Sequence, residues 1–420
     1  MKMRFPALIW AGFFCVFATA QQPYGFVDAR MGWRTGDDPF QETRPLTELR
    51  LQTAWNQLWS WGELQVTLDA VLDEVADDRE DIDWERGQGW ADLRELYLLM
   101  SPFTWMDVKL GRQILTWGTG DLLFINDLFP KDWQSFFAGR DEAYLKAPSD
   151  AVFISLFPGP VNLDIAYMPR FDADRFISGT RFSYYNPMLG RIAGNDAVIE
   201  PIVPDSWGQD SELALRLYRN LGGVEVAGYG YSGFWKSPSG FDPQAGSPLF
   251  PPLQVAGISA RWAWGKALVN GELGYLDTQR SGQKANAQLP PDEWRLLLGY
   301  ERELARNFTA AFQYYLEKID QVGGEQGRPD PGSPVRDEYR HVFSLRMTRL
   351  AMNQNLKLSF FSYYSPSDSD GYARPMISYQ YSDRWRFLAG GNVFWGQQRT
   401  TFFGQFEDNS NVYLGVRYSY

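Results

Sequence analysis

Cysteine, histidine and long apolar stretches are nearly absent from this chain of 420 residues. The one cysteine, Cys15, lies within a leader-like segment, so the chain from residue 21 onward can form neither a disulfide nor a thiolate metal site. No later stretch reaches the roughly 20 apolar residues that a membrane-spanning helix needs. A net charge of −11 opposes nucleic-acid binding, and no phosphate loop or other cofactor motif is present. These absences argue against a disulfide-rich domain, a helical membrane protein and a nucleic-acid-binding protein.

The N-terminal residues have the three parts of a secretory signal peptide. Lys2 and Arg4 precede an apolar stretch at 7–17, and small residues at 18–20 supply a cleavage pattern. The apolar stretch is too short to cross a membrane, which argues against the alternative of an N-terminal anchor. We therefore predict a signal peptide at 1–20.

After this segment one unit recurs: about ten residues in which polar and apolar side chains alternate, followed by a break. In ELQVTLD, for example, Leu64, Val66 and Leu68 alternate with polar residues, and in the last unit Val412 and Leu414 do so. About eighteen such units follow one another. The predicted strands are 24–35, 47–59, 62–75, 90–101, 105–117, 151–158, 161–170, 211–221, 223–234, 253–264, 266–278, 292–304, 307–319, 339–350, 355–365, 372–382, 384–396 and 409–420.

The breaks between these strands are predicted to alternate strictly between short and long. Short ones are 60–61, 158–160, 222–223, 306–307, 352–353 and 382–383, and long polar ones include 76–89, 118–150, 171–210, 235–251 and 319–338. Short turns on one side and long loops on the other are typical of outer-membrane barrels. An even number of strands returns both termini to the short-turn side, the periplasm.

Tryptophan is also placed as a membrane barrel requires. Several tryptophans fall near strand ends, where an interfacial aromatic girdle belongs. They are Trp33, Trp59, Trp105, Trp264, Trp385 and Trp395. A soluble β-sandwich is the alternative, but sandwiches seldom have eighteen strands. In lipid only closure satisfies every backbone group. We therefore predict an all-β fold, a closed antiparallel transmembrane barrel of about 18 strands spanning 21–420.

Two short motifs resemble those of known outer-membrane proteins. The stretch GRQILTWG at 111–118, after LRELYL at 93–98, resembles the alginate-export-like porin group and related uncharacterised barrels. The C-terminal strand ending in Tyr420 is similar to the signal read by the bacterial barrel-assembly machinery. The resemblance implies a Gram-negative outer membrane, with lipid around the barrel and passage of small solutes or polysaccharide. It assigns no role to individual residues.

Arg112 falls on the apolar face of its predicted strand. Pairing about a turn near Pro102 and Phe103 places Glu95 beside Arg112, on the same face. Either Gly111 marks a bulge that turns the pair inward, or the pair faces outward and neutralises itself. Because an unpaired arginine facing lipid is costly, we expect an inward or protein-covered pair that fixes strand register.

The inward positions of the barrel carry charge. The predicted channel-lining residues are Arg340, Arg346, Lys357, Arg374, Arg386 and Arg417 on a basic wall, and Glu48, Glu63 and Asp69 elsewhere. The segment 118–150 is acidic and aromatic, and is expected to fold inward because its aromatic rings need cover. Its predicted constriction residues are Asp121, Asp127, Asp132, Asp141, Glu142 and Trp133. A transverse field would then orient polar solutes. Alternatively, the charges only pair and stiffen the barrel, or the segment stays outside.

The sequence thus predicts a porin for small hydrophilic or anionic solutes or polysaccharide. A plugged barrel that binds a partner through loop 171–210 is the alternative. An enzyme is least favoured, because His341 and Ser362 lack an orienting group and acids such as Asp77 and Asp78 lie in an ordinary polar loop. No catalytic residue, metal or cofactor is assigned.

Overall fold

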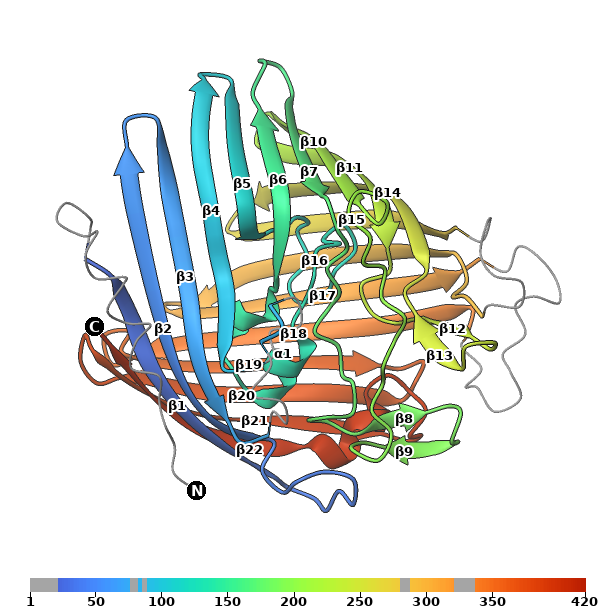
Figure 1. Ribbon diagram of the computed structural model, residues 1–420. Coiled ribbons are helices and arrows are strands. Elements are labelled where there is room, and N and C mark those ends of the chain that lie inside the picture. The colour runs from blue at the N-terminus through green and yellow to red at the C-terminus, as the bar shows by residue number, and fades with distance from the viewer. Residues whose placement is uncertain (1–21, 76–81, 85–88, 280–287, 321–336) are drawn as a thin grey trace.

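Eighteen strands form one closed antiparallel sheet in the computed structural model (Figure 1). The structure describes residues 22–75, 82–84, 89–279, 288–320 and 337–420. Each barrel strand pairs with the next along the chain, and the last pairs with the first, from Phe26 opposite Ser419 to Arg34 opposite Asn411. The predicted fold class is therefore confirmed. The expected signal peptide lies outside the described residues.

The barrel strands follow the predicted spans closely. They are β1 (Tyr24–Arg34), β2 (Leu46–Trp59), β3 (Gly62–Asp73), β4 (Ala91–Phe103), β5 (Met106–Ile114), β6 (Pro148–Leu156), β7 (Asn162–Met168), β10 (Glu212–Leu221), β11 (Val224–Phe234), β14 (Pro252–Trp264), β15 (Ala267–Thr278), β16 (Glu293–Ala305), β17 (Phe308–Ile319), β18 (Tyr339–Ala351), β19 (Leu356–Ser365), β20 (Asp370–Gln380), β21 (Trp385–Gly396) and β22 (Asn411–Ser419).

The remaining elements belong to the long connections at one end of the barrel (Figure 1). They are two hairpins, β8 (Tyr184–Asn186) with β9 (Arg191–Ala193) and β12 (Gly240–Asp242) with β13 (Ser247–Leu249), the helix α1 (Trp133–Ala138), and the 3₁₀ helices η2 (Glu142–Leu145) and η4 (Gly404–Asn409). Among the described residues, no helix is long and apolar enough to cross a membrane.

The alternation of short and long breaks holds with one exception. The connection between β19 and β20, at 366–369, is short although it lies on the long-loop side. The prediction of strict alternation is therefore wrong at this point. The opposite side keeps tight turns, for example at Gly222 and Gly223, whose positive φ angles of 60° and 92° suit a two-residue hairpin turn.

The two faces of the sheet differ as the alternation predicts. Leu217, Ile258 and Leu298 lie on the outer face and are more than half exposed, whereas the inward Leu297 is fully buried. Aromatic rings stack near the short turns, with centroids 5.2 Å apart for Trp59 and Trp61. An apolar outer band with aromatic rings at its edge is the surface that lipid favours.

The prediction that Glu95 pairs with Arg112 is wrong. The β4–β5 ladder shifts by one residue between Met100 and Phe103, so that Leu96 lies opposite Arg112. A one-residue slip moves a side chain to the other face. Glu95 instead accepts a hydrogen bond from Thr67 Oγ1 at 3.0 Å.

Arg112 is covered by protein at the loop end of the barrel and is only 5% exposed. Its Nε donates to the carbonyl oxygen of Leu93 at 2.8 Å, and Nη2 donates to that of Trp84. Nη1 lies 3.4 Å from the half-exposed carboxylate of Asp150, the residue opposite on β6. Arg112 therefore joins β4, β6 and the loop before β4.

We expect Arg112→Ala to lower the free energy of unfolding by about 1–3 kcal/mol, because two carbonyl oxygens lose their donor in a covered site. Urea unfolding of the barrel in lipid vesicles measures this change. Arg349→Ala is the matched control, since Arg349 is exposed and donates only to the carbonyl of Arg306 among the contacts described. A loss no larger than that of the control would contradict the structural role.

Candidate functional site

The connection between β5 and β6 crosses the interior of the ring of strands (Figure 1). We call residues 118–147 the strap. Its backbone and side chains contact wall residues on opposite sides of the barrel, Glu272 on β15 and Arg30 on β1 among them. Within it, Asp132 caps α1 by accepting from Ser135 N at 2.7 Å. Gly139 ends that helix with a φ of 89°. The strap is thus an ordered segment attached to the wall at several points.

A buried carboxylate holds the first part of the strap. Glu272 Oε1 accepts from Gly120 N at 2.9 Å and from Thr119 N, and Oε2 accepts from Asn126 Nδ2 at 2.9 Å and Asn126 N at 3.3 Å. Glu272 is only 3% exposed. Several N–H donors compensate the cost of burying its charge.

The wall beside Glu272 is shaped for the strap. A Cβ atom on Gly257 would overlap the side chain of Asn126, and one on Gly274 would lie 2.6 Å from Ile125 Cγ2. Both glycines occupy inward positions of β14 and β15, next to Glu272 in the sheet. Glycine at these positions lets the strap approach the backbone of the wall.

Arginines hold the strap on the other side. The Arg346 guanidinium on β18 contacts Asp121 at 2.5 Å and 2.9 Å, and Glu142 at 3.0 Å through both terminal nitrogens. Asp141 lies between Arg30 at 2.6 Å and Arg417 at 2.7 Å. Ionised groups in such geometry form strong hydrogen bonds. Three of the predicted constriction acids therefore contact wall arginines.

The other predicted constriction residues contact loop residues instead. Asp127 binds Lys131 at 3.0 Å and also Lys146, and these ammonium groups lower its pKa although burial opposes the shift. Asp132 lies 3.3 Å from Arg175, and Trp133 Nε1 donates to Asp174 at 3.2 Å. These residues stabilise the strap and its neighbouring loop.

Two predicted lining acids do not face open water. Glu48 accepts from Arg140 Nε at 2.8 Å, and Asp69 accepts from the Tyr144 hydroxyl at 2.8 Å. Arg50 bridges them at 2.8 Å and 2.6 Å. Because the strap covers Glu48 and Asp69, the expectation that they line a channel is wrong. Glu63, nearer the short turns, accepts a hydrogen bond from Asn56.

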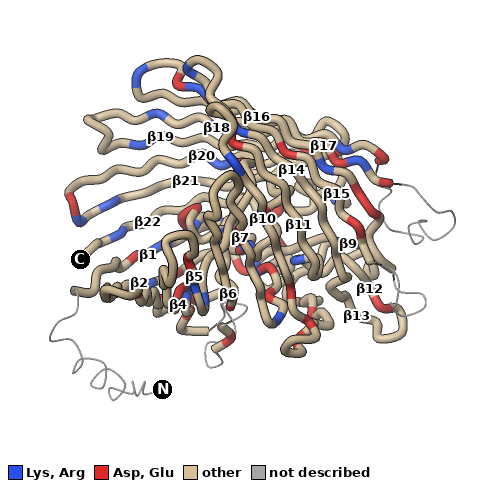
Figure 2. Tube along the Cα trace, turned by 90° about the horizontal axis from the view of Figure 1, so that it is seen from above, with Lys and Arg blue, Asp and Glu red and all other residues tan. Residues whose placement is uncertain are grey.

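The remaining residues of the predicted basic wall differ in their partners. Arg340 contacts Asp368 at 2.5 Å and Glu317 at 3.4 Å. Arg374 Nη2 donates to the carbonyl of Arg140 at 2.6 Å. Arg386 donates to Gln380 Oε1 at 2.9 Å, and Lys357 is exposed. No carboxylate pairs with Arg386 or Lys357 among the described residues. Figure 2 shows both signs of charge around the ring of strands.

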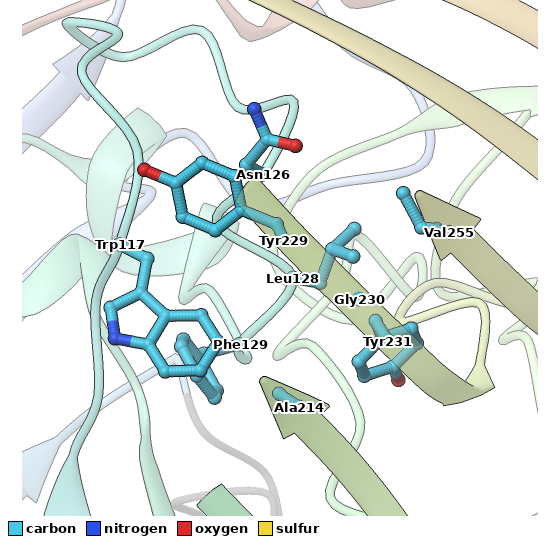
Figure 3. A pocket seen from close by; sticks show the side chains of 9 residues that line it. All are labelled: Trp117, Asn126, Leu128, Phe129, Ala214, Tyr229, Gly230, Tyr231 and Val255. Carbon is cyan, nitrogen blue, oxygen red and sulfur yellow. The ribbon is translucent and has the colours of Figure 1, made fainter. Parts of the chain in front are cut away.

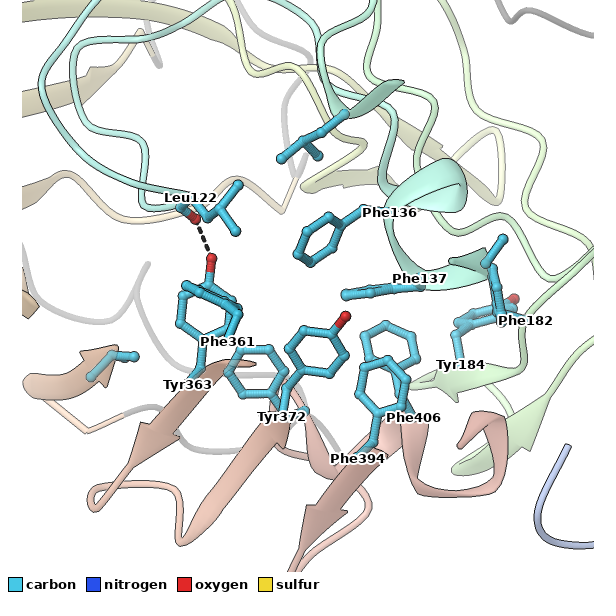
Figure 4. Close-up of a cluster of buried hydrophobic side chains, with 14 of the residues drawn as sticks. Leu122, Phe136, Phe137, Phe182, Tyr184, Phe361, Tyr363, Tyr372, Phe394 and Phe406 are labelled. Carbon is cyan, nitrogen blue, oxygen red and sulfur yellow. Dashed lines mark hydrogen bonds between the residues drawn. The ribbon is translucent and has the colours of Figure 1, made fainter. Parts of the chain in front are cut away.

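An apolar cluster seals one side of the strap (Figure 4). The rings of Phe136 and Phe137 pack on Tyr372, with centroids 5.7 Å and 5.5 Å away. Phe137 also meets Phe394 at 5.0 Å and Phe406 at 5.4 Å. Burial of several aromatic rings stabilises this contact more than any single ion pair at the surface.

The opposite side is closed almost as well (Figure 3). Trp117, just before the strap, packs on Phe129 and on Tyr229 of β11 at 5.0 Å and 6.2 Å. The cavity left between strap and wall measures about 10 Å³. This volume is at the limit for a single water molecule. The contact between strap and wall at Trp117, Phe129 and Tyr229 therefore leaves no space for a solute.

The next loop covers the strap on the outer side. Arg175 contacts both oxygens of Asp92 at 2.8 Å, and Arg181 Nη1 donates to the carbonyl of Pro45 at 2.6 Å. Phe182 joins the apolar cluster around Phe137. The half of the lumen nearer the long loops is thus largely filled by side chains.

Sequence reasoning missed several of these residues. Glu272 is one of several inward acids, and nothing in its neighbourhood along the chain singles it out. The inward glycines Gly257 and Gly274 were an available signal, because glycine weakens a strand unless another segment approaches there. Arg30 and Arg50 alternate with acids on β1 and β2, a pattern that indicates an inward ion-pair network.

No protein-family model and no curated protein matches the chain. Among solved structures, Acinetobacter baumannii OccAB3 is similar with a TM-score of 0.54 at 10% identity, covering 95% of this chain and 99% of that one. A loop-deletion mutant of Vibrio cholerae OmpT has a TM-score of 0.41 at 11% identity, covering 95% and 98%. A mutant Rhodopseudomonas blastica porin has 0.41 at 9%, covering 95% and 99%. The likeness to OccAB3 shows a porin-like barrel fold. Neither the alginate-export-like group nor its motif is shown.

We expect Glu272→Ala to release the first part of the strap, because four N–H donors lose their acceptor. Amide hydrogen exchange at 119–126 should then accelerate at least tenfold. Glu301→Ala is the control, since Glu301 is an exposed residue on β16. Unchanged amide protection at 119–126 in Glu272→Ala would show that the other contacts of the strap hold this segment in place without Glu272.

The loop after β7 should respond to pH. Burial raises the pKa of Asp172 from 3.8 to about 6, against the opposing effect of Arg112. The folded state therefore binds more protons than the unfolded state between these values, and stability falls as pH rises from about 4 to 6. We expect this part of the decrease, roughly 1–3 kcal/mol, to vanish in Asp172→Asn. Urea unfolding at pH 4.5 and 7 measures it, and an equal decrease in both proteins would contradict the assignment.

Proposed function

We propose that this protein is an outer-membrane channel for small hydrophilic solutes in Gram-negative bacteria, with the strap as its constriction. The observation that carries the proposal is the contact of Arg346 with Asp121 and Glu142. These charged groups lie across the interior of a closed ring, and the side chains are 20%, 34% and 47% exposed. Water therefore reaches an ion-paired constriction inside the barrel.

The size of the ring supports a channel. Barrels of 16 to 18 strands are wide enough for an aqueous lumen. A wide, polar interior narrowed by an inward segment can select solutes by size and charge. The likeness to OccAB3 supports the same fold and carries no substrate with it.

The charges of the wall favour small anions at the short-turn end. Among the described residues Lys357 and Arg386 form no ion pair within 4 Å, although Arg386 interacts electrostatically with Asp141, and both raise the local concentration of anions. The carboxylates of the strap oppose anions farther in. Polysaccharide is less favoured, because a polymer would need the strap to leave its packed position.

A plugged barrel that binds a partner through its loops is the second candidate. The filled outer half of the lumen favours it, as does the exposed side chain of Met188 in the β8–β9 hairpin. For either function, we propose that the last strand is read by the barrel-assembly machinery. Its end is held in place by Tyr420 N, which donates to Gly25 O at 3.0 Å.

Conductance in a planar bilayer separates the two candidates. We expect the intact protein to conduct and deletion of 119–146 to raise single-channel conductance several-fold, because the segment across the lumen is then removed. Deletion of the β12–β13 hairpin at 240–249 is the control and should change conductance little.

No conductance in the intact protein would contradict the channel and favour the partner-binding barrel. Equal conductance of the two deletion variants would show that the strap is not the constriction. Heat-dependent migration on a gel confirms in each case that the barrel has formed.

A further inference from the structure

We propose that the outer face of β10, β11, β14 and β15 binds one anionic phospholipid, with an acyl chain in an apolar groove and the headgroup phosphate at Arg219. This inference depends on the barrel lying in a membrane and not on the channel function. It rests on three features of that face: two outward glycines with open space above them, a hollow over these glycines, and Arg219 at the end of the hollow.

The first feature is a pair of outward glycines on β11. Gly228 lies opposite Leu217 and Ile258, and Gly230 lies opposite Leu215 and Ala256. A Cβ atom added to either glycine would meet no atom within 4 Å. The inward glycines at 257 and 274 differ, because the strap fills the space above them.

Glycine in the interior of a strand weakens it and often marks a place where a ligand approaches closely. Because a Cβ atom on Gly228 or Gly230 would meet no atom, the space above them is open to a molecule outside the barrel. Beside Gly228 that molecule lies in the hydrocarbon region, since its outer-face neighbours Leu217 and Ile258 are apolar.

The second feature is the hollow itself. Over Gly228 it has a volume of about 630 Å³ and is bordered by Leu217, Ile258 and Leu298. A second hollow of about 410 Å³, over Gly230 and Ala256, continues it along β11. The second hollow is bordered by Leu213 and Leu215 but also by Ser232, Gln254 and Asp277, so the apolar part of the groove lies over Gly228. A chain seated in it gains van der Waals contacts on several sides, which a chain on a convex surface lacks.

The third feature is Arg219, which borders the hollow near the short-turn end of β10. It is exposed, and no hydrogen bond or ion pair joins it to another of the described residues. Arginine binds phosphate through two parallel hydrogen bonds. Trp264 on β14, 69% exposed, lies at the same end of the barrel, where tryptophan marks the membrane interface.

These features select a lipid rather than a second copy of the chain. Two copies meeting through the same face would bring one Arg219 toward the other in an apolar contact. A phospholipid supplies both an acyl chain and an opposite charge. An anionic headgroup is favoured over a zwitterionic one, because it carries no ammonium group that the Arg219 guanidinium would repel.

Native mass spectrometry of the full barrel, released from detergent with added phosphatidylglycerol or phosphatidylcholine, tests the proposal. We expect the intact protein to retain one phosphatidylglycerol with at least fivefold higher occupancy than phosphatidylcholine. Gly228→Leu should remove this retention, because the side chain occupies the groove. Arg219→Gln should make the two lipids equal, and Arg384→Gln, on the β20–β21 turn, should change nothing.

Equal occupancy of the two lipids in the intact protein, or full retention in Gly228→Leu, would overturn the proposal. A dimer or trimer that dissociates in Gly228→Leu without lipid preference would also overturn it and assign the groove to a second copy. If Gly228→Leu does not form a heat-modifiable barrel, Ala260→Leu on the same face gives the same test.

Discussion

Closure of the backbone hydrogen-bond ladder is the constraint on which the rest of this structure depends. In lipid, an open sheet would leave a row of unpaired N–H and C=O groups at each edge. Pairing of β22 with β1 removes both edges. The closed ring then has an outer face that must suit lipid and an inner face that can carry charge. The groove over Gly228 and the ion pairs around the strap are consequences of these two different surroundings.

The interior of the ring is stabilised by contacts of opposite character. On the β15 side, Glu272 accepts backbone hydrogen bonds from a strap that lies directly on the glycines of the wall. On the β18–β22 side, aromatic packing around Phe137 and the ion pairs of Arg346 hold the same segment. The hydrogen bonds to Glu272 require donors at fixed positions, whereas the packing around Phe137 requires only that the rings fill the space between strap and wall. The strap therefore has a defined place while some of its carboxylates still meet water.

The sequence predicted the barrel well because strand alternation and turn position are local properties. All eighteen barrel strands coincide with predicted spans to within a few residues. The partner of Arg112 could not be predicted, because the β4–β5 turn lies at 104–105 and not near Pro102 and Phe103, and because one additional residue between Met100 and Phe103 then shifts the ladder. The same limit applies to the site. The alternation of side chains along the strand identified Arg346 as an inward residue. It could not show that Asp121 and Glu142 both bind its guanidinium, because the path of the strap determines those contacts.

The central claim is that the strap is held against the wall inside the barrel, and a cross-link tests it most directly. Residues 21–420 contain no cysteine, so Asn126→Cys with Gly257→Cys introduces the only two thiols of this part of the chain. A side chain at 257 would lie against that of residue 126, within reach of a disulfide. We predict that the disulfide forms in the assembled barrel and that single-channel conductance stays the same before and after reduction. Two free thiols that react with a membrane-impermeant maleimide would contradict the account.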